Sequence, residues 1–186
     1  AAQVRELDRL AIAGGIAGFE LMRRAGQAAF ASLQQHWPDR SPIEVFCGGG
    51  NNGGDGYIVA ALAAEASLPV KVWTLADPAS INGDAALAME WAVEAGVAIQ
   101  QWRGEAPNKA GLVVDALLGT GLKGRVREKY AQAIAAINAS GVPVLALDVP
   151  SGLCSDSGRK LGAAIKASAT ISFIGRKRGM YTLEGI

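Results

Sequence analysis

Three short segments concentrate the residues of this sequence that could do chemistry. The first, Gly48–Gly56, follows a short apolar stretch and reads Gly-Gly-Gly-Asn-Asn-Gly-Gly-Asp-Gly. Glycines let a ligand approach the main chain closely, and the free amides at the start of a following helix attract an anion such as a pyrophosphate. Gly48, Gly50 and Gly53 also satisfy the G-x-G-x-x-G pattern of dinucleotide-binding loops. The segment therefore predicts a phosphate-binding loop that opens a helix.

A simpler interpretation of the same segment is a tight turn without a ligand. Asn-Gly and Asp-Gly steps favour turns, and Asp55 could cap the following helix. Six glycines in nine residues exceed what a turn alone requires, so we favour ligand binding. No Gly-Lys-Ser or Gly-Lys-Thr step follows, which argues against a P-loop nucleotidase.

The other two segments each begin with an aspartate at the end of an apolar stretch. Asp115–Arg125 continues as a glycine-rich loop with two cations, and Asp148–Leu153 contains a Pro-Ser-Gly step. Ligands of open parallel sheets bind beyond the carboxyl ends of the strands, where parallel strands would bring all three segments together. Carboxylate, amide and hydroxyl oxygens suit a hard cation, and a carboxylate beside a bound ligand could exchange protons with it. The sequence thus predicts one oxygen-rich site at one edge of a sheet.

The sequence offers few residues for other kinds of catalytic site. Serine hydrolysis requires a base, but the only histidine, His36, falls late in an amphipathic helix and is expected to be solvated or to pack. Cys47 ends an apolar strand and is expected to be inert, and no Cys/His cluster indicates zinc. Lys177, between Arg176 and Arg178, could belong to a solvated cluster or reach a phosphate, and the sequence leaves both open.

Helices and strands alternate along the chain in a way that would position the three segments. Apolar spacing predicts two N-terminal helices separated near residues 14–18, and later helices over 58–66, 87–95 and 126–137. Strands are expected at 43–47, 69–75, 97–101, 111–115, 143–147 and 169–174. This alternation favours a Rossmann-like, three-layer αβα sandwich with a mostly parallel sheet and helices on both faces. No linker or repeat divides the chain, so we expect one α/β domain over residues 1–186.

Composition argues against several classes of protein. Half of the residues are hydrophobic and 19% are charged, with 18 Lys and Arg against 17 Asp and Glu. This balance excludes wholesale disorder and offers no basic surface for nucleic acid. The longest uncharged run, Tyr130–Leu147, contains polar residues, Gly and Pro, so no membrane span is expected. Cys47 and Cys154 form no disulfide pattern and no signal peptide is visible, so we expect a reducing, cytoplasmic compartment.

The three segments together resemble the YjeF N-terminal domain family, the NAD(P)H-hydrate epimerases. The matching motifs are G-x-G-N-N-G-G-D-G-Y at Gly48–Tyr57, D-A-L-L-G-T-G-L-x-G at Asp115–Gly124 and D-V-P-S-G-L at Asp148–Leu153, in the family's order and spacing. The likeness extends over nearly the whole chain, through Leu21-Met22 with Ala25-Gly26 and through Phe173 with Lys177 and Gly179. Two departures lie outside the motifs: Arg23-Arg24 stands where an acidic residue often follows Leu-Met, and Lys129 replaces a common proline.

The resemblance implies a Rossmann-like isomerase that epimerises damaged nicotinamide cofactor. The family interconverts the R and S hydrates of NADH and NADPH (NADHX and NADPHX), so that an S-specific, ATP- or ADP-dependent dehydratase can restore the reduced cofactor. Members are usually homodimers. In bacterial fusions the dehydratase follows the epimerase domain, and the stop at Ile186 resembles the end of the first half of such a fusion.

The resemblance also implies roles for individual residues. Asn51–Asp55 would bind the phosphate and ribose portion of the substrate, and Gly119–Arg125 would line the opposite wall. Asp148 would lie near the hydrated ring, where we assign it the general acid/base role. A potassium ion would be held by Asn52, Asp115 and Ser151, in agreement with the oxygen-only ligands noted above. The implied substrate-binding residues are Asn51, Asn52, Gly53, Gly54, Asp55, Gly119, Thr120, Gly121, Leu122, Lys123, Gly124, Arg125 and Asp148.

Two alternative functions share parts of this pattern. An NAD(P)-dependent oxidoreductase would use the same glycine loop and an acidic residue about 20 positions further on for the ribose, for which Asp77 is a candidate. A non-catalytic nucleotide-binding or scaffold module would keep the fold without the chemistry, although the intact set of Asn51–Asp55, Asp115 and Asp148 speaks against it.

Overall fold

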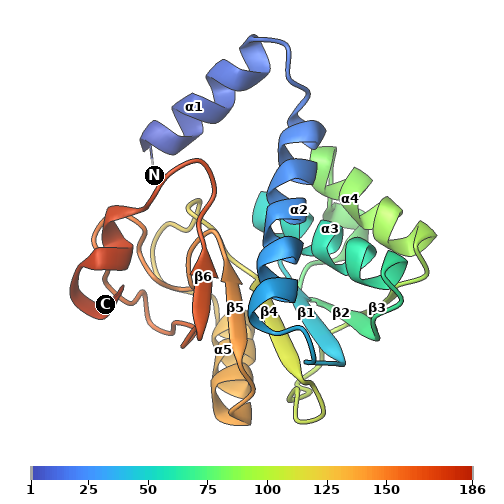
Figure 1. Cartoon of the computed structure of the whole chain (residues 1–186). Helices are drawn as coiled ribbons and strands as arrows, with labels where there is room; N and C mark the ends of the chain where they lie inside the picture. Colours follow the sequence, from blue (N-terminus) through green and yellow to red (C-terminus); the bar gives the residue numbers. More distant parts are fainter. Residues whose placement is uncertain (1, 186) are drawn as a thin grey trace.

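Within residues 2–185, which are those that the computed structural model describes, six strands form one sheet. Every pairing of neighbouring strands is parallel, and the spatial order is β3-β2-β1-β4-β5-β6 (Figure 1). Side-chain environments are described for residues 6, 7 and 9–185. The strands are β1 Ile43–Cys47, β2 Val70–Thr74, β3 Ala98–Gln101, β4 Leu112–Ala116, β5 Val144–Leu147 and β6 Ala169–Ile171. The order reverses between β1 and β4, where open parallel sheets bind ligands.

Helices cover both faces of this sheet (Figure 1). Because alternate side chains of a strand point to opposite faces, Val45 packs in the cluster of apolar residues from α2, α3 and α4, whereas Phe46 packs with Ile134 and Ile137 of α5. The αβα layering expected from the sequence is therefore confirmed. The helices are α2 Gly18–His36, α3 Asn51–Glu65, α4 Gly83–Glu94 and α5 Glu128–Ser140, and α1 Ala2–Ala13 lies apart from them, beyond the ends of the strands.

The predicted elements occur in the predicted order, with different ends. The clearest difference is α3, which begins at Asn51 rather than near residue 58, so the second half of the glycine-rich segment is helical. Gly56 explains why this helix tolerates glycine: a Cβ there would lie 2.5 Å from Cβ of Ala116 and 2.9 Å from Sγ of Cys47. Glycine at position 56, beyond the G-x-G-x-x-G pattern itself, thus lets α3 rest directly on β1 and β4.

None of the helices within residues 2–185 is long and apolar enough to span a membrane.

Candidate active site

The three chemistry-bearing segments gather at the carboxyl ends of β1, β4 and β5. The parallel register pairs Cys47 with Ala116, and Asp115 with Ala146, so these strands end side by side. Gly48 N donates to Ala116 O at 3.0 Å, which joins the first segment to the second. The convergence that the sequence predicts therefore follows from the parallel sheet.

Asn52, in the first turn of α3, has an unusual environment. The residue is 8% exposed, and neither Oδ1 nor Nδ2 of its amide has a hydrogen-bond partner among the described residues. The helix is preceded by Gly50, which provides no side-chain cap. The alternative in which Asp55 caps the helix is therefore wrong, because Asp55 lies inside it. Buried amides are nearly always partnered in folded proteins, so the Asn52 side chain faces a position where a ligand would satisfy it.

Asp115 and Ser151 form a buried pair that ties the second segment to the third. Oδ1 of Asp115 accepts from the Ser151 hydroxyl at 2.6 Å and from Leu117 N at 3.2 Å, while Oδ2 accepts from Ser151 N at 2.8 Å. The hydroxyl in turn accepts from Leu118 N at 2.8 Å. Asp115 is fully buried, and this burial raises its pKa to about 6, although the hydrogen bonds from Ser151 and Leu117 oppose the shift.

Asp148 lies at the start of the third segment in a left-handed backbone conformation, with φ 66°. Its amide donates to Ile171 O at 2.7 Å, and its Oδ2 accepts a long hydrogen bond from Thr120 N at 3.4 Å. Gly119 lies next to both Asn52 and Asp148: a Cβ on Gly119 would be 3.2 Å from Cβ of Asn52 and 3.4 Å from Oδ2 of Asp148. The Asp148 carboxylate is thus turned toward the Asn52 helix start, not away from it.

Lys177 is the residue whose position the sequence did not indicate. It is 3% exposed, so it belongs to no solvated cluster, and its Nζ forms an ion pair with Oδ1 of Asp148. The neighbouring Arg176 and Arg178 are exposed. A lysine between two arginines gives no sign of burial, and its partner lies 29 positions earlier in the chain.

Two cavities of opposite character meet at Asn51, which lines both. The larger, about 1130 Å³, lies between the start of α3 and the second segment and is basic, since it is lined by Lys123, Arg125, Arg127 and Lys129 against one acidic residue, Asp77. The smaller, about 480 Å³, is acidic, since Asp55, Asp84 and Asp148 line it against Arg24. An anionic group fits the first cavity, and a neutral or cationic group fits the second.

Most of the predicted substrate-binding residues line one of these cavities. The larger one includes Asn51, Asn52, Arg125 and residues 119–123, and the smaller one includes Asn51, Asp55 and Asp148. Gly53, Gly54 and Gly124 line neither cavity. Gly53 and Gly54 are buried within α3, so they contribute close packing of the helix and do not line a cavity.

Three residues considered from the sequence alone lie away from the ligand chemistry or have another role. His36 is exposed and its Nδ1 lies 2.8 Å from Ser32 O, while Cys47 is buried with its thiol pKa raised by burial. Asp77 lines the larger cavity, but its carboxylate accepts from Ala79 N at 3.0 Å and caps the short helix Pro78–Ser80. Within residues 2–185, no cluster of three His, Cys, Asp or Glu side chains could hold a metal ion.

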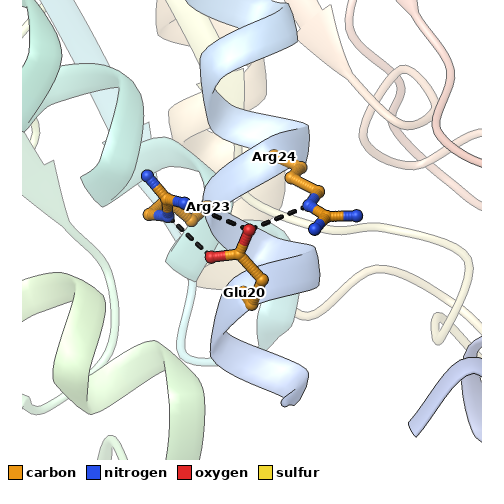
Figure 2. A network of polar contacts seen from close by, with 3 residues as sticks. All are labelled: Glu20, Arg23 and Arg24. Carbon is orange, nitrogen blue, oxygen red and sulfur yellow. Dashed lines mark hydrogen bonds and ion pairs between the residues drawn. The ribbon is translucent and has the colours of Figure 1, made fainter. Parts of the chain in front are cut away.

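The Arg23-Arg24 departure from the family pattern forms a surface network on α2. Both guanidinium groups donate to the Glu20 carboxylate, Arg23 Nε at 2.8 Å and Arg24 Nε at 2.8 Å (Figure 2). The two hydrogen bonds, Arg23 first, lower the pKa of Glu20 to about 2. Arg24 nonetheless lines the smaller cavity, so its ion pair with Glu20 keeps the Arg24 charge at the wall of that cavity.

Comparison with known proteins assigns the chain to a family. The sequence model described as YjeF-related protein N-terminus matches residues 18–179. The chain belongs to this family.

Its relatives include longer proteins that are named NAD(P)H-hydrate repair enzymes or epimerases. It is 48% identical over 180 residues to the bifunctional NAD(P)H-hydrate repair enzyme Nnr of Coxiella burnetii, covering 97% of this chain and 37% of that protein. It is 33% identical over 173 residues to the NAD(P)H-hydrate epimerase of Legionella pneumophila, covering 89% of this chain and 64% of that protein. The chain therefore spans about a third of the first relative. The crystal structure of yeast ynu0 (YNL200c) matches 91% of the chain with a TM-score of 0.80 at 20% identity, which supports the fold.

Proposed function

We propose that this YjeF-related domain is an isomerase that interconverts the R and S hydrates of NADH and NADPH. The observation that carries the proposal is the Asp148 carboxylate, held against Gly119 and turned toward the start of α3, in the acidic cavity that adjoins a basic one. Relatives named for NAD(P)H-hydrate epimerisation and repair support the substrate class.

A hydrated dinucleotide matches the charge of the two adjoining cavities. Its pyrophosphate would bind at the amino end of α3, where free backbone amides favour an anion, with Lys123, Arg125 and Arg127 nearby. The uncharged hydrated ring would then extend past Asn51 toward Asp148. This orientation agrees with the roles that the family resemblance implies for Asn51–Asp55, Gly119–Arg125 and Asp148.

The reaction requires that the stereocentre carrying the C6 hydroxyl be lost and rebuilt. In the ring-opening route, the Asp148 carboxylate, paired with Lys177 at rest, would take the proton of the C6 hydroxyl as the C6–N1 bond breaks and give it to N1. Closure from the other face by the reverse steps would rebuild the stereocentre. In the dehydration route, Asp148 would first take a proton from solvent, give it to the departing oxygen as water leaves and take a proton back from the water that adds to the other face.

The residues implied for potassium fit a hard cation. Asn52 presents a buried carbonyl oxygen without a partner, and Asp115 and Ser151 present buried carboxylate and hydroxyl oxygens. The Leu117–Gly119 stretch links them, because Leu118 contacts Ser151 while Gly119 lies against Asn52. We propose that Asn52, Asp115 and Ser151 hold a potassium ion that joins the three segments by neutralising the buried carboxylate.

Two partners complete the proposal. We propose that the chain acts as a homodimer, as its family resemblance implies, and that an ATP- or ADP-dependent dehydratase, fused or separate, consumes the S hydrate. We also propose a cytoplasmic, reducing location, in which Cys47 and Cys154 stay free thiols as they are in the structure.

The test is to follow the R hydrate of NADPH by NMR with the chain and with its Asp148→Asn variant. The chain should convert the R form to the S form until both reach equilibrium. The variant should fold and bind NADP⁺ but lose about 10²- to 10⁴-fold in rate, the usual contribution of a general acid or base. Binding of NADP⁺ without turnover by the unaltered chain would support the non-catalytic module instead, and turnover of the variant at the unaltered rate would remove Asp148 from the mechanism.

A further inference from the structure

The buried ion pair of Lys177 with Asp148 is the feature of the site that the proposed function leaves unexplained. The Lys177 side chain is fully buried, and the Asp148 side chain is 14% exposed. Removing an ammonium group from water is costly unless its charge is paired and its donors are satisfied. Burial of Lys177 therefore costs free energy of folding, and the contacts of its ammonium group indicate its role.

Lys177 uses all of its hydrogen-bonding capacity inside the protein. Nζ carries three donors and no acceptor, and it has three partners: Oδ1 of Asp148, Oγ of Ser172 at 2.9 Å and the Phe173 carbonyl oxygen at 2.7 Å. No N–H remains for a phosphate or for the hydrated ring. Lys177 is also absent from the lining of both cavities. It is accordingly neither a phosphate ligand nor a proton donor to substrate.

The backbone on both sides of the ion pair is strained. Asp148 has φ 66° and Ile174 has φ 63°, a region that residues other than glycine seldom occupy and that a β-branched residue avoids. Gly175 N and Lys177 Nζ both donate to the Phe173 carbonyl, at 2.6 and 2.7 Å, and Asp148 N donates to Ile171 O. Lys177 thus holds the turn after β6 and the turn after β5 together. Strain of this kind persists only where surrounding contacts enforce it, and it clusters at functional sites.

The two carboxylate oxygens of Asp148 consequently have different hydrogen-bond partners. Oδ1 is occupied by the ammonium group of Lys177, whereas Oδ2 faces the Gly119–Thr120 turn through one long hydrogen bond. We propose, on the basis of the proposed function, that Lys177 is a positioning residue: it fixes Oδ1 of Asp148 so that Oδ2 alone exchanges the proton with the hydrated ring.

The test compares four proteins in the NMR assay: the chain, Lys177→Met, Asp148→Asn and the double variant Asp148→Asn/Lys177→Met. Methionine keeps the length and removes the charge. Lys177→Met should lower kcat by about 100-fold, the effect of misplacing a catalytic group by about 1 Å. KM should change by less than roughly threefold, because the lost interaction does not bind substrate.

The double variant gives the decisive comparison. If Lys177 acts only through Asp148, the double variant should be as slow as Asp148→Asn alone, because residues that act as a unit are not additive. Arg176→Met is the matched control, since it removes one positive charge from the adjacent, exposed position, and it should keep the kcat of the chain.

Three results would overturn the proposal: an unchanged kcat in Lys177→Met, a rise in KM alone, or a double variant in which the two losses multiply. If Lys177→Met fails to fold, Lys177→Gln takes its place, because glutamine keeps a donor for Ser172 and Phe173 but removes the charge that pairs with Oδ1 of Asp148. A lower kcat at constant KM in Lys177→Gln supports the proposal, and an unchanged kcat contradicts it. Failure of the unaltered chain to epimerise would instead contradict the proposed function, so the two outcomes are distinguishable.

Discussion

Asp115 shows how a single buried residue organises the site. It accepts three hydrogen bonds, and the donors of two come from Ser151 in a different segment. A carboxylate without exposed surface needs such partners, so the second and third segments cannot separate without leaving a buried charge unpaired. The Asp115–Ser151 pair therefore fixes the position from which Asp148, three residues earlier, begins its segment.

Replacing Ser151 by alanine tests this pair. The variant removes the hydroxyl that donates to Asp115 and accepts from Leu118 N, so it should lower the free energy of unfolding by about 1–3 kcal/mol, the cost of an unsatisfied buried group. Urea denaturation measures the change. Ser80→Ala is the control, because Ser80 is exposed and its loss should change stability by less than about 0.5 kcal/mol. Equal midpoints for the two variants would contradict the structural role of the pair.

Arg125 offers a prediction about substrate binding. It lines the basic cavity, away from Asp148, so Arg125→Gln should remove an interaction that is equally strong before and during the reaction. We expect KM for the R hydrate to rise about tenfold, since losing one charge-assisted hydrogen bond costs about 1.5 kcal/mol, with kcat nearly unchanged. Steady-state kinetics by NMR gives both constants. A fall in kcat with an unchanged KM would show that Arg125 does not act as a uniform binding residue.

The sequence alone predicts the positions of some site residues but not of others. The sequence identifies Asn52, Asp115 and Asp148 as one site because each lies at or shortly after the end of an apolar run, and parallel pairing of the strands then brings them together. It does not identify the Asp148–Lys177 pair, because that contact depends on the turn after β6 folding back beside the turn after β5. Local patterns do not encode such long-range side-chain packing.

At the scale of elements, α3 departs from its own local preference. Three glycines lie in its first six residues, and each costs about 1 kcal/mol in a helix relative to alanine. The helix forms nonetheless because it rests against β1 and β4 and packs with α2 and α4. The glycines therefore hide the start of α3 from a sequence pattern, whereas β1 and β4 are recognised from their short apolar runs, although Glu44 and Asp115 lie within them.

Gly56→Ala tests the close contact between α3 and the sheet. The added methyl would collide with Ala116 and Cys47, so the variant should be destabilised by about 1–3 kcal/mol, the usual cost of overpacking. Thermal unfolding provides the measurement, with Gly121→Ala as the matched control because a Cβ there meets open space. If both variants unfold at the temperature of the unaltered chain, α3 has room to move and the argument from close packing fails.

At the scale of the whole molecule, the potassium proposal predicts ion-specific stability. Potassium chloride should raise the melting temperature above that in tetramethylammonium chloride of equal ionic strength. The corresponding gain in the free energy of unfolding should reach about 2.7 kcal/mol at 100 times the dissociation constant. Asn52→Leu should abolish this response. Without potassium the variant should be no less stable than the unaltered chain, because the amide it removes has no hydrogen-bond partner among the described residues. Identical melting temperatures in the two salts would contradict the ion site.

The proposed homodimer is open to a direct measurement. Sedimentation equilibrium should give twice the chain mass of 19.1 kDa at micromolar concentration. A mass of one chain at every concentration would exclude the dimer, and the epimerase proposal would then be tested on the monomer.

Asn51 separates a compartment with excess positive charge from one with excess negative charge. A metabolite that occupies both must be elongated and must differ chemically between its two ends. A fragment carrying the hydrated ring without the pyrophosphate would reach only the acidic compartment and would lack an anchor. On the proposed function, a site divided in this way would favour intact dinucleotides over their breakdown products, because only the intact molecule carries a suitable group for each compartment.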